Sequence, residues 1–490
     1  MEALKPILLK KSDVDGPIQN CEEGQPLSPI ARLCHQPDSC LYIIVMIGIK
    51  TKLDPKVIKA DLVQSLLKQP RFSSLLVEDE TVKGGMKWVQ TEVNLDNHVI
   101  VPKLDPNNIN SPDKFVDDYI SNLSKTKIKR SMPMWDIHLL NLKTSDAESV
   151  AVLRLHHSLG DGTSLMSLFL AYSRKISNPN ERPTIPVVKK VNPSSSSGTF
   201  WGNIIKLWNT LVDVPMFLAT SLSLLNDTKT PLKGPLRQTR RFVRRSLSLD
   251  DVKLVKKTMN ATINDVMLGV TQAGLSRYLN RKYGECDKSD KGASERSNNL
   301  PHNIRLRAAL FMNLRKSPGS QELDYMMKKG SKARWGNEFG YLFYPFTMAI
   351  RDDPLDYLRE AKATMDRKKA SLEASFSYFL AKCFLKLGSV KVLPVFQTSL
   401  FNETTVWFSN IPGPAEEISF YGYPVAYIAP SCYGQPTGLL IHVVSYGNKI
   451  TFILSIDEGI IPDPNQLCDD LEESFNLIKT AALAKGMFTN

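Results

Sequence analysis

The sequence predicts a mixed α/β protein built from two halves, and three observations support this fold class. The chain has 490 residues, which is more than one hydrophobic core usually serves, so two or three domains are expected. Hydrophobic residues make up 42% and charged residues 23% of the chain, as in globular proteins. Strand-like and helix-like segments occur on both sides of a Ser- and Pro-rich stretch at residues 185–199, whose composition is typical of a flexible linker.

In the first half, Leu41–Ile49 is an apolar run of the length expected for a buried strand. Asp54 offers a helix N-cap and Pro55 suits the first helical position. They predict a helix with Val57, Leu62, Leu66 and Leu67 on one side. The other elements predicted in this half are strands Val99–Val101 and Ser149–Leu155 and helix Thr163–Ile176.

Phe200–Leu225, between the halves, has apolar residues at helical spacing. Such a helix packs its apolar face on a domain or lies on a membrane, and Trp201, Trp208 and Lys206 favour the second alternative. The apolar run Val214–Asn226 is too short to cross a bilayer, which takes about 20 residues.

The second half is also mixed. Residues Leu249–Leu279 are helical in character, and 281–301 are so polar and charged that an exposed, disordered loop is expected. Tyr446–Lys449 suits a hairpin turn. The remaining predictions are strands Ala308–Leu314, Tyr341–Ile350, Thr404–Phe408, Leu439–Ser445 and Ile450–Ile456, and helix Asp463–Thr480.

The net charge of +12 indicates a solvated basic surface, or an anionic partner such as a membrane or a nucleotide-bearing thioester. Nucleic acid is not expected, because no zinc-ligand spacing, RNA-binding signature or basic-region heptad accompanies the charge. The seven cysteines form no C-x-x-C pair, which predicts reduced thiols facing the cytosol. The first residues lack the basic and apolar regions of a signal peptide.

The segment His156-His157-Ser158-Leu159-Gly160-Asp161-Gly162 follows an apolar strand and precedes a helix. Moving an acyl group from a thioester to an alcohol needs a base for the hydroxyl proton and a donor for the oxyanion. The thiolate leaves readily, so no metal is required. Histidine suits the base, because its unperturbed pKa of about 6.5 leaves a neutral fraction near pH 7.

Neighbouring side chains on a strand point to opposite faces, so one histidine of the pair is expected to face the substrate and the other to be buried. Asp161 is expected to hold the turn or to pair with a nearby arginine. Gly162 allows close approach of the backbone or an unusual φ. The full HHxxxDG pattern after an apolar strand is far more specific than a His-His pair, and it favours catalysis.

This segment resembles the HHxxxDG acyltransferase superfamily, which includes chloramphenicol acetyltransferase-like folds, plant phenolic acyltransferases, peptide-synthetase condensation domains and wax ester synthases. The resemblance implies two chloramphenicol acetyltransferase-like mixed-sheet domains with the active-site tunnel between them. It also implies that His157 is the general base, that His156 supports it, and that Asp161 is structural.

Further segments are similar to the plant-type wax ester synthase/diacylglycerol acyltransferase family, from about residue 26 to 482. Pro133-Met134-Trp135 resembles its Pro-Leu-Trp element, with Met for Leu. Thr262–Val266 contains Asn264 and Asp265 and looks like its Asn-Asp motif, which implies residues near the channel, although Asn-Asp alone also caps helices. The other similar segments are Pro26–Pro29, Phe311–Arg315, Trp335–Tyr341 and Ser409–Pro414.

Composition and resemblance together predict a lead-in at 1–25, an N-terminal acyltransferase domain at 26–184, a linker and amphipathic helix at 185–235, and a C-terminal domain at 236–490. The resemblance implies transfer from long-chain acyl-CoA to a long-chain fatty alcohol and, more weakly, to diacylglycerol. It implies acyl-CoA as cosubstrate, no cofactor and no metal. It also implies the endoplasmic reticulum membrane, with the active site facing the cytosol, or the plasma membrane.

Asn264 is the first candidate for the oxyanion donor. Ser409, Asn410 and Ser431 are further candidates, and each is equally an ordinary turn residue. Two other functions remain open. One is a soluble HHxxxDG acyltransferase with a smaller alcohol or amine acceptor. The other is a non-catalytic lipid-binding relative on the same fold.

Overall fold

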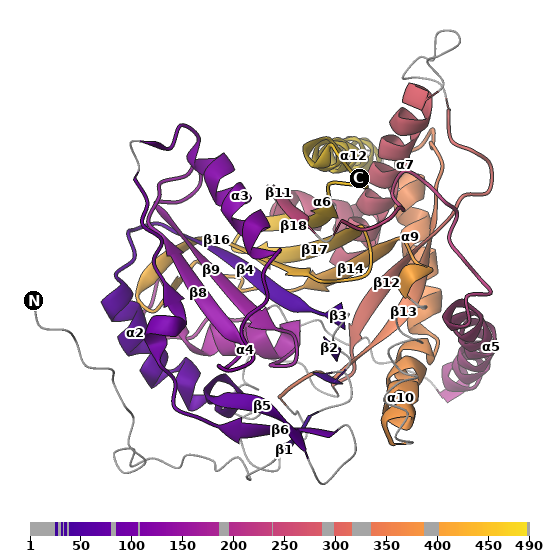
Figure 1. The fold of residues 1–490 in the computed structure, drawn as a ribbon. Helices are drawn as coiled ribbons and strands as arrows, with labels where there is room; N and C mark the ends of the chain where they lie inside the picture. The colour runs from indigo at the N-terminus through magenta and orange to yellow at the C-terminus, as the bar shows by residue number, and fades with distance from the viewer. Residues whose placement is uncertain are drawn as a thin grey trace, which may run out of the picture.

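Two mixed β-sheets, one in each half of the molecule, form the framework of the protein (Figure 1). The computed structural model describes residues 25–27, 31–32, 34–36, 39–79, 85–105, 108–185, 196–237, 239–286, 298–315, 335–386 and 401–487. The seven-stranded sheet has the order β10-β15-β16-β4-β9-β8-β7, and the six-stranded sheet has the order β11-β18-β17-β14-β12-β13. Parallel pairs occur in both sheets amid antiparallel ones. The α/β prediction is therefore confirmed.

The bounds of these strands follow the order of each sheet. The seven-stranded sheet contains β10 (Ser173–Lys175), β15 (Ile418–Phe420), β16 (Tyr423–Tyr433), β4 (Tyr42–Ile49), β9 (Ser149–His156), β8 (Trp135–Leu140) and β7 (Val99–Ile100). The six-stranded sheet contains β11 (Arg240–Ser248), β18 (Lys449–Asp457), β17 (Leu439–Tyr446), β14 (Val406–Ile411), β12 (Arg305–Asn313) and β13 (Phe339–Thr347). Two smaller sheets contain β1 (Gln25–Pro26), β6 (Gly85–Gln90) and β5 (Ser74–Asp79), and β2 (His35–Gln36) and β3 (Ser39–Cys40).

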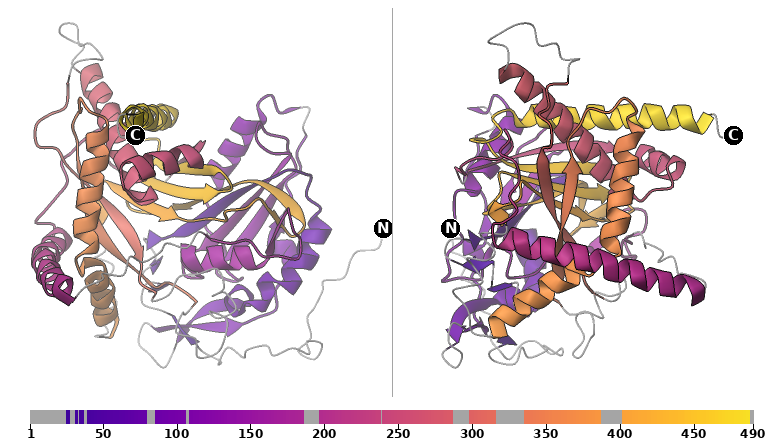
Figure 2. Two further views of the ribbon diagram at one scale, coloured as in Figure 1. Left: turned by 180° about the vertical axis from the view of Figure 1, so that it is seen from behind. Right: turned by 90° about the vertical axis from the view of Figure 1, so that its right-hand side faces the viewer.

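Helices cover the outer faces of the sheets (Figures 1 and 2). In the second half, one large core lies between the six-stranded sheet and its helices. In the first half, two apolar clusters lie on the two faces of the seven-stranded sheet. The helices are α2 (Pro55–Gln64), α3 (Pro112–Leu123), α4 (Gly162–Ala171), α5 (Ser196–Ser221), α6 (Leu249–Thr258), α7 (Ile263–Cys286), α9 (Leu355–Lys369), α10 (Glu373–Lys386) and α12 (Pro464–Met487).

The predicted start of α2 is confirmed, because the Asp54 side chain accepts a hydrogen bond from the Lys56 backbone N–H at 2.8 Å and Pro55 is the first helical residue. The hairpin is confirmed as well. Tyr446 pairs with Lys449, and Gly447 has the positive φ of 54° that this tight turn requires. The described cysteines Cys34, Cys383, Cys432 and Cys468 are free thiols.

Four predictions of helices and loops need correction. The helix that begins at Pro55 ends at Gln64, so Leu66 and Leu67 lie in a 3-10 helix after it, and Val57 is exposed. Residues 249–279 form two helices, α6 and α7, because Asn260 has a left-handed φ of 46° that ends the first one. The helix predicted to reach Ile176 ends at Ala171, and β10 follows as an edge strand paired with β15. Residues 281–286 belong to α7, not to a loop, whereas 287–297 lie outside the described residues. So do the lead-in at 1–24 and most of the linker, 186–195.

The chain crosses between the two halves near its C-terminal end. β16 pairs along its length with β4, so that residues after 420 complete the sheet of the first half. Figure 1 shows this strand reaching across the molecule. A division of the chain at residue 236 therefore does not coincide with the division between the sheets. The predicted domain boundaries themselves stay predictions.

Helix α5 does not pack its apolar face on a domain, and that alternative is wrong. Its large apolar side chains, including Trp201 and Trp208, are exposed. In the parts of the chain that the structure describes, every helix falls short of the length and apolar character needed to cross a bilayer.

Candidate active site

His157 follows directly after β9, the strand paired with β4 on one side and β8 on the other. The alternation of side chains along a strand puts Ala151, Leu153 and Leu155 on one face of this sheet, and His157 continues their row. All four line one cavity. The twin-histidine segment thus brings an imidazole to the end of an apolar strip.

The cavity has a volume of about 920 Å³ and lies between the two halves. Its apolar wall includes Ile43, Val45, Ile47, Leu165 and Phe169 from the first half and Phe311, Tyr341, Phe401 and Trp407 from the second. Its polar wall includes Asn264, Asn313, Arg315, Lys369, Ser377, Ser409, Asn410, Ser431 and His442. The predicted placement of the site between two halves is therefore borne out by the lining.

Two hydrogen bonds to Asn337 fix the orientation and tautomer of His157. The Asn337 side-chain Nδ2 donates to the His157 carbonyl oxygen at 3.0 Å. The amide oxygen Oδ1 therefore faces the imidazole, 3.1 Å from His157 Nδ1. Because Oδ1 only accepts, Nδ1 must carry the proton, and the lone pair of the neutral ring lies on Nε2. A neutral imidazole with its lone pair on Nε2 can accept a proton from a hydroxyl group.

The surroundings keep His157 neutral. Burial in the cavity wall lowers its pKa below the ordinary value, and this effect outweighs the opposing influences of Asp161 and Asn337. The ring packs edge-on against Phe339, with centroids 6.0 Å apart. A second buried histidine, His442 on β17, also lines the cavity. Burial, with a smaller contribution from His157, lowers the pKa of His442 to about 3.

His156 points the other way, as predicted. It is buried, its Nδ1 lies 2.7 Å from Ser158 Oγ, and its ring meets Tyr42 edge-on at 5.2 Å. Its backbone N–H donates to the Met134 carbonyl at 2.9 Å. His156 therefore supports the strand end from the face opposite the cavity.

Asp161 is the N-cap of α4 and also ties the two halves together. Its Oδ1 accepts from the Ser164 N–H at 2.9 Å. Its Oδ2 accepts from Arg315 Nη1 at 2.8 Å and from the Glu338 N–H at 2.9 Å. The Asp161 and Arg315 side chains are only 6% and 2% exposed. Both expectations, that Asp161 holds the turn and that it meets an arginine, are met in one carboxylate.

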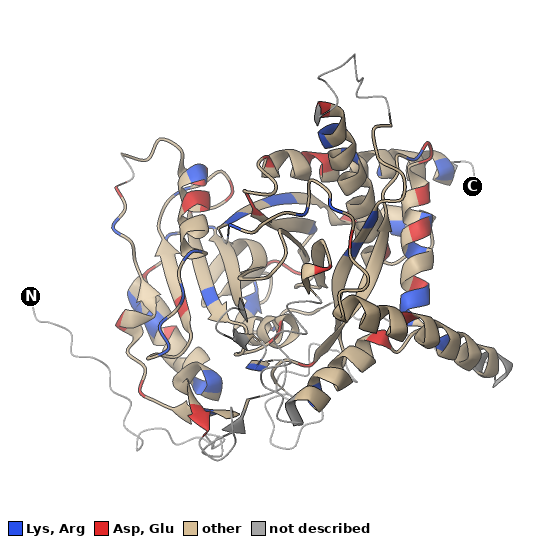
Figure 3. Ribbon diagram, turned by 45° about the vertical axis from the view of Figure 1, so that its right-hand side comes forward, with Lys and Arg blue, Asp and Glu red and all other residues tan. Residues whose placement is uncertain are grey.

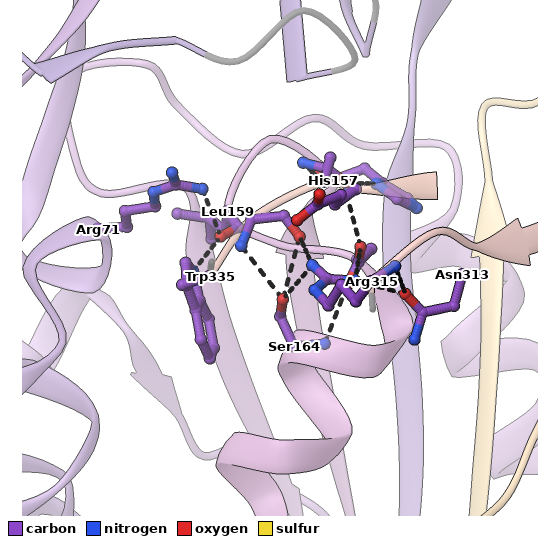
Figure 4. Close-up of polar contacts among 11 residues, drawn as sticks. Arg71, His157, Leu159, Ser164, Asn313, Arg315 and Trp335 are labelled. Atoms are coloured by element: carbon purple, nitrogen blue, oxygen red, sulfur yellow. Dashed lines mark hydrogen bonds and ion pairs between the residues drawn. The ribbon is translucent and has the colours of Figure 1, made fainter. Parts of the chain in front are cut away.

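The segment Trp335–Glu338 presses against the histidine turn (Figure 4). Trp335 Nε1 donates to the Leu159 carbonyl at 2.9 Å. The Gly336 carbonyl accepts from Arg315 Nη2 at 2.8 Å and from Ser164 Oγ at 3.0 Å. Gly336 has φ of +130°, a conformation that L side chains rarely adopt, so glycine is required there.

Gly162 has no unusual φ, which corrects one of the two readings for it. The other expectation, a close approach at this position, is met, because a Cβ at Gly162 would lie 2.5 Å from the Ile411 side chain on β14.

Trp135 is fully buried at the start of β8, and its Nε1 donates to the Phe72 carbonyl at 2.8 Å. Pro133 is buried beside it and its carbonyl accepts from the Trp135 N–H. The Pro133 and Trp135 pair is thus structural.

The Asn-Asp pair divides into two roles. Asp265 is buried and caps α7, since its Oδ2 accepts from the Thr262 N–H at 2.8 Å while Thr262 Oγ1 accepts from the Asp265 N–H at 3.1 Å. Asn264 lines the cavity instead. Its Oδ1 accepts from Asn410 Nδ2 at 3.2 Å, which leaves the Asn264 N–H groups available to a ligand.

The chain is similar to proteins of one known family. Residues 50–267 match the family model described as "Wax ester synthase/diacylglycerol acyltransferase catalytic domain", and residues 335–479 match the "WS/DGAT C-terminal domain". The chain is 48% identical to wax ester synthase/diacylglycerol acyltransferase 5 of Arabidopsis thaliana, over 94% of both chains. It is also 48% identical to wax ester synthase/diacylglycerol acyltransferase 4 of the same plant, over 94% of this chain and 91% of the relative.

The chain belongs to the wax ester synthase/diacylglycerol acyltransferase family. It is thus a member of an acyltransferase family, as the histidine motif predicted. Among solved structures it is similar to the wax ester synthase/diacylglycerol acyltransferase of Marinobacter aquaeolei VT8, with a TM-score of 0.58 and 17% identity, over 94% of this chain and 100% of the other. A starter condensation domain of rhizomide synthetase gives a TM-score of 0.52 at 13% identity, over 94% and 95%. These two likenesses show the two-domain fold.

Three residues that contact the histidine turn or line the cavity of this wax ester synthase/diacylglycerol acyltransferase family member were not singled out from the sequence. They are Asn337, Arg315 and His442. Asn337 and Arg315 stand in segments that matched the family, but their contacts with His157 and Asp161 span 180 and 154 residues of sequence. His442 sits in the ordinary strand β17, and only its burial in the cavity wall reveals it.

Of the other oxyanion candidates, Ser409 and Asn410 lie on β14 and line the cavity. Ser431 also contributes to the lining and is buried. Its Oγ has no hydrogen-bond partner among the described residues. Ser431 pairs with Ile44 of β4, which puts its side chain on the opposite face of the sheet from Ile43. It is therefore separate from the apolar strip that leads to His157.

Proposed function

We propose that this chain is an O-acyltransferase that moves a long-chain acyl group from acyl-CoA to a long-chain fatty alcohol, giving a wax ester, and more weakly to diacylglycerol, giving triacylglycerol. His157 is the general base of both reactions. The observation that carries the proposal is the neutral imidazole of His157, oriented by Asn337 on the wall of a largely apolar cavity between the halves.

The chemistry follows from this geometry. His157 Nε2 accepts the proton of the acceptor hydroxyl while the oxygen attacks the thioester carbonyl. The carbonyl oxygen becomes an oxyanion, and the Asn264 side-chain amide is the donor that stabilises it. When the tetrahedral intermediate collapses, the C–S bond breaks and the CoA thiolate receives the proton from His157. The acyl group is then bonded to the acceptor oxygen as an ester, and the imidazole returns to its neutral form without any cofactor.

The size and polarity of the cavity favour lipid substrates over small ones. The strip from Ala151 to His157 covers six residues of strand, about 20 Å at roughly 3.3 Å per residue, which is the reach of a long acyl chain. A smaller alcohol or amine acceptor leaves most of this apolar surface in contact with water. The lining therefore supports the long-chain reading over the soluble small-acceptor alternative.

The names of the relatives include both wax ester synthase and diacylglycerol acyltransferase. The preference for a fatty alcohol over diacylglycerol is part of our proposal. A product assay tests it in yeast cells that lack their own neutral-lipid acyltransferases, with and without added hexadecanol. We expect wax ester only with added alcohol, a smaller amount of triacylglycerol, and neither product from His157→Ala. Triacylglycerol without wax ester would move the function to diacylglycerol acylation. Well-folded protein without any neutral lipid would support the small-acceptor or non-catalytic alternatives.

The cellular location belongs to the same proposal. Lipid acceptors reside in membranes, and the free thiols suit a reducing compartment. We expect the enzyme at the endoplasmic reticulum membrane with its active site facing the cytosol, and the plasma membrane is the second candidate. Imaging of a fluorescent fusion beside organelle markers distinguishes the two.

A further inference from the structure

Helix α5 has an unusual arrangement, because it turns polar side chains towards the protein and apolar ones towards solvent. Asn209 Nδ2 donates to the carbonyls of Arg367 and Ala370 at 3.3 and 3.2 Å. Asp213 is fully buried and accepts from Lys368 Nζ at 2.9 Å. Of the large apolar residues in the middle of the helix, Phe217 alone packs fully into the body, against aromatic rings of the second half.

The opposite face of α5 is apolar and exposed. Trp201 and Trp208 are 66% and 67% exposed, and Ile205, Leu211 and Met216 are each about half exposed. At 3.6 residues per turn, the exposed apolar residues cover roughly half of the helix circumference. The whole helix carries two charged residues, Lys206 and Asp213, so it is nearly uniform in colour in Figure 3. Exposed apolar surface of this extent marks an interaction site.

Buried ion pairs hold α5 in this orientation. The Asp213 carboxylate lies 2.9 Å from Lys368 Nζ and 3.0 Å from Arg367 Nη2. Lys368 also contacts Glu373 at 2.7 Å. Rotating the helix to bury its tryptophans would expose or unpair these charges, and unpaired buried charges are strongly destabilising. The apolar face is therefore held outwards by the fold.

Helix α5 lies against α9 and α10, and both of these helices contribute residues to the cavity wall. Lys369, the last residue of α9, lines the cavity and is 39% exposed, and it stands between Arg367 and Ala370, whose carbonyls bind Asn209. α10 lies beside α5 (Figure 2). On α10, Tyr378 and Ala381 line the cavity while Phe379 is 61% exposed. The cavity wall is therefore built in part from the two helices against which α5 packs.

Charge and side-chain type indicate what this face meets. Lys206 is an exposed cation on α5 itself, and Lys369 and Lys382 are exposed cations on α9 and α10, the two helices that α5 contacts. Tryptophans beside lysines suit the boundary between headgroups and acyl chains, and cations attract anionic lipids.

We propose that the exposed face of α5, together with Phe379 of α10, docks on an anionic lipid bilayer and so brings the cavity wall formed by α9 and α10 close to the membrane. The lipid acceptor then enters the cavity from the bilayer without crossing water. The entry of the acceptor rests on the proposed function, whereas docking itself does not.

Vesicle flotation of the full chain tests the docking. Phosphatidylcholine vesicles with and without phosphatidylserine are mixed with the parent, with Trp208→Glu/Leu211→Glu, and with the matched control Leu477→Glu/Leu483→Glu. The control residues are exposed on α12, far from α5 (Figure 2). We expect the parent and control to float, more strongly with phosphatidylserine. We expect the α5 variant to partition about 100-fold less, since each lost apolar side chain is worth roughly tenfold. The milder Trp201→Ala/Trp208→Ala serves if the glutamates impair folding, which a thermal melt shows.

Three results would overturn the docking surface. One is a parent that stays with the soluble fraction, and another is an α5 variant that floats like the parent. The third is a parent that is dimeric without lipid while the α5 variant is monomeric, because the face then belongs to a second copy. Ester formation from a short acyl-CoA and a short alcohol, measured in parallel, separates the two proposals. The α5 variant must retain it. A parent that floats but forms no ester contradicts the enzyme function and leaves the docking surface standing.

Discussion

Asn337 makes two hydrogen bonds to His157, and each has its own consequence. The bond from Nδ2 to the His157 carbonyl orients the amide. The bond at Oδ1 then keeps the proton on Nδ1, so that Nε2 is the basic nitrogen. A base of this kind works only when unprotonated, so activity falls with acid as the ring gains its proton. Because burial lowers the pKa of His157, this loss begins below the ordinary histidine value of about 6.5.

Replacing Asn337 tests the arrangement through the pH profile. Asn337→Asp puts a carboxylate beside Nδ1, which stabilises the imidazolium and raises the pKa of His157. We expect the acidic limb of kcat/KM to move to higher pH. Asn337→Ala loses the orientation, and we expect kcat about 100-fold lower at every pH, as misplacement of a catalytic group commonly costs. An unmoved acidic limb in Asn337→Asp would contradict the assigned contact.

The ion pair between Asp161 and Arg315 is expected to stabilise the folded protein. Arg315→Met leaves a buried carboxylate without its cation, which typically costs about 3–5 kcal/mol. We expect a lower unfolding midpoint in denaturant, together with lower activity. Arg359→Met is the matched control, because its ion pair with Asp353 is 46% and 44% exposed and such pairs contribute about 0–1 kcal/mol. Equal losses in the two variants would contradict the account.

At this scale the sequence predicted what is local. The strand, the turn and the helix cap place His156, His157 and Asp161 within six residues, and their roles follow from period-two alternation and capping. The partners Asn337 and Arg315 come from a segment far along the chain. Their positions depend on how two halves pack, which no local pattern encodes. The same holds for His442, whose strand looks like any other buried strand.

At the scale of elements, β9 and β4 define the apolar strip that leads to His157. Alternate residues of both strands face the cavity, and Ala151 is the cavity-lining residue of β9 that lies furthest from His157. We therefore expect this strip to set the length of the substrate hydrocarbon chain that lies along it.

Ala151→Trp is expected to shorten that strip. We predict a shift of chain-length preference towards shorter chains for one of the two substrates, with short-chain turnover close to the parent value. The measurement is competition among acyl-CoAs, and separately among alcohols, of different length. The substitution Val57→Trp, on the exposed side of α2, is the control. Unchanged preference for both substrates in Ala151→Trp would show that neither chain lies on this strip.

Helical spacing predicted α5, but not which of its faces points outwards. The answer depends on Asp213 and on Lys368, which lies 155 residues further along the chain. The crossing strand β16 escaped prediction for a different reason. It carries Pro424 and Pro430 and polar residues between its apolar ones, so its period-two pattern is weak. Pairing with β4 along eight residues is what holds β16 in the extended conformation.

At the scale of the whole molecule, the two halves share a sheet. β16 covers one edge of β4 along eight paired residues, from Tyr42 to Ile49. A fragment that ends before β16 leaves this edge unpaired, with an apolar face exposed on either side.

Residues 1–235 alone are therefore expected not to fold, and the full chain is expected to unfold cooperatively. Circular dichroism melts and limited proteolysis of the fragment and the full chain test this. A fragment that melts sharply and resists protease would contradict the shared sheet. Recovery of activity by co-expressing residues 1–235 with 236–490 would agree with it.

We propose that His157 is the general base for acyl transfer in the cavity between the halves. The most direct test is the turnover of purified His157→Ala with palmitoyl-CoA and hexadecanol, beside the exposed control His302→Ala and thermal melts of all proteins. We predict that His157→Ala keeps the parental melt and loses about 10²–10⁴-fold in kcat, while His302→Ala stays at the parent value. Near-parental turnover in folded His157→Ala would contradict the mechanism.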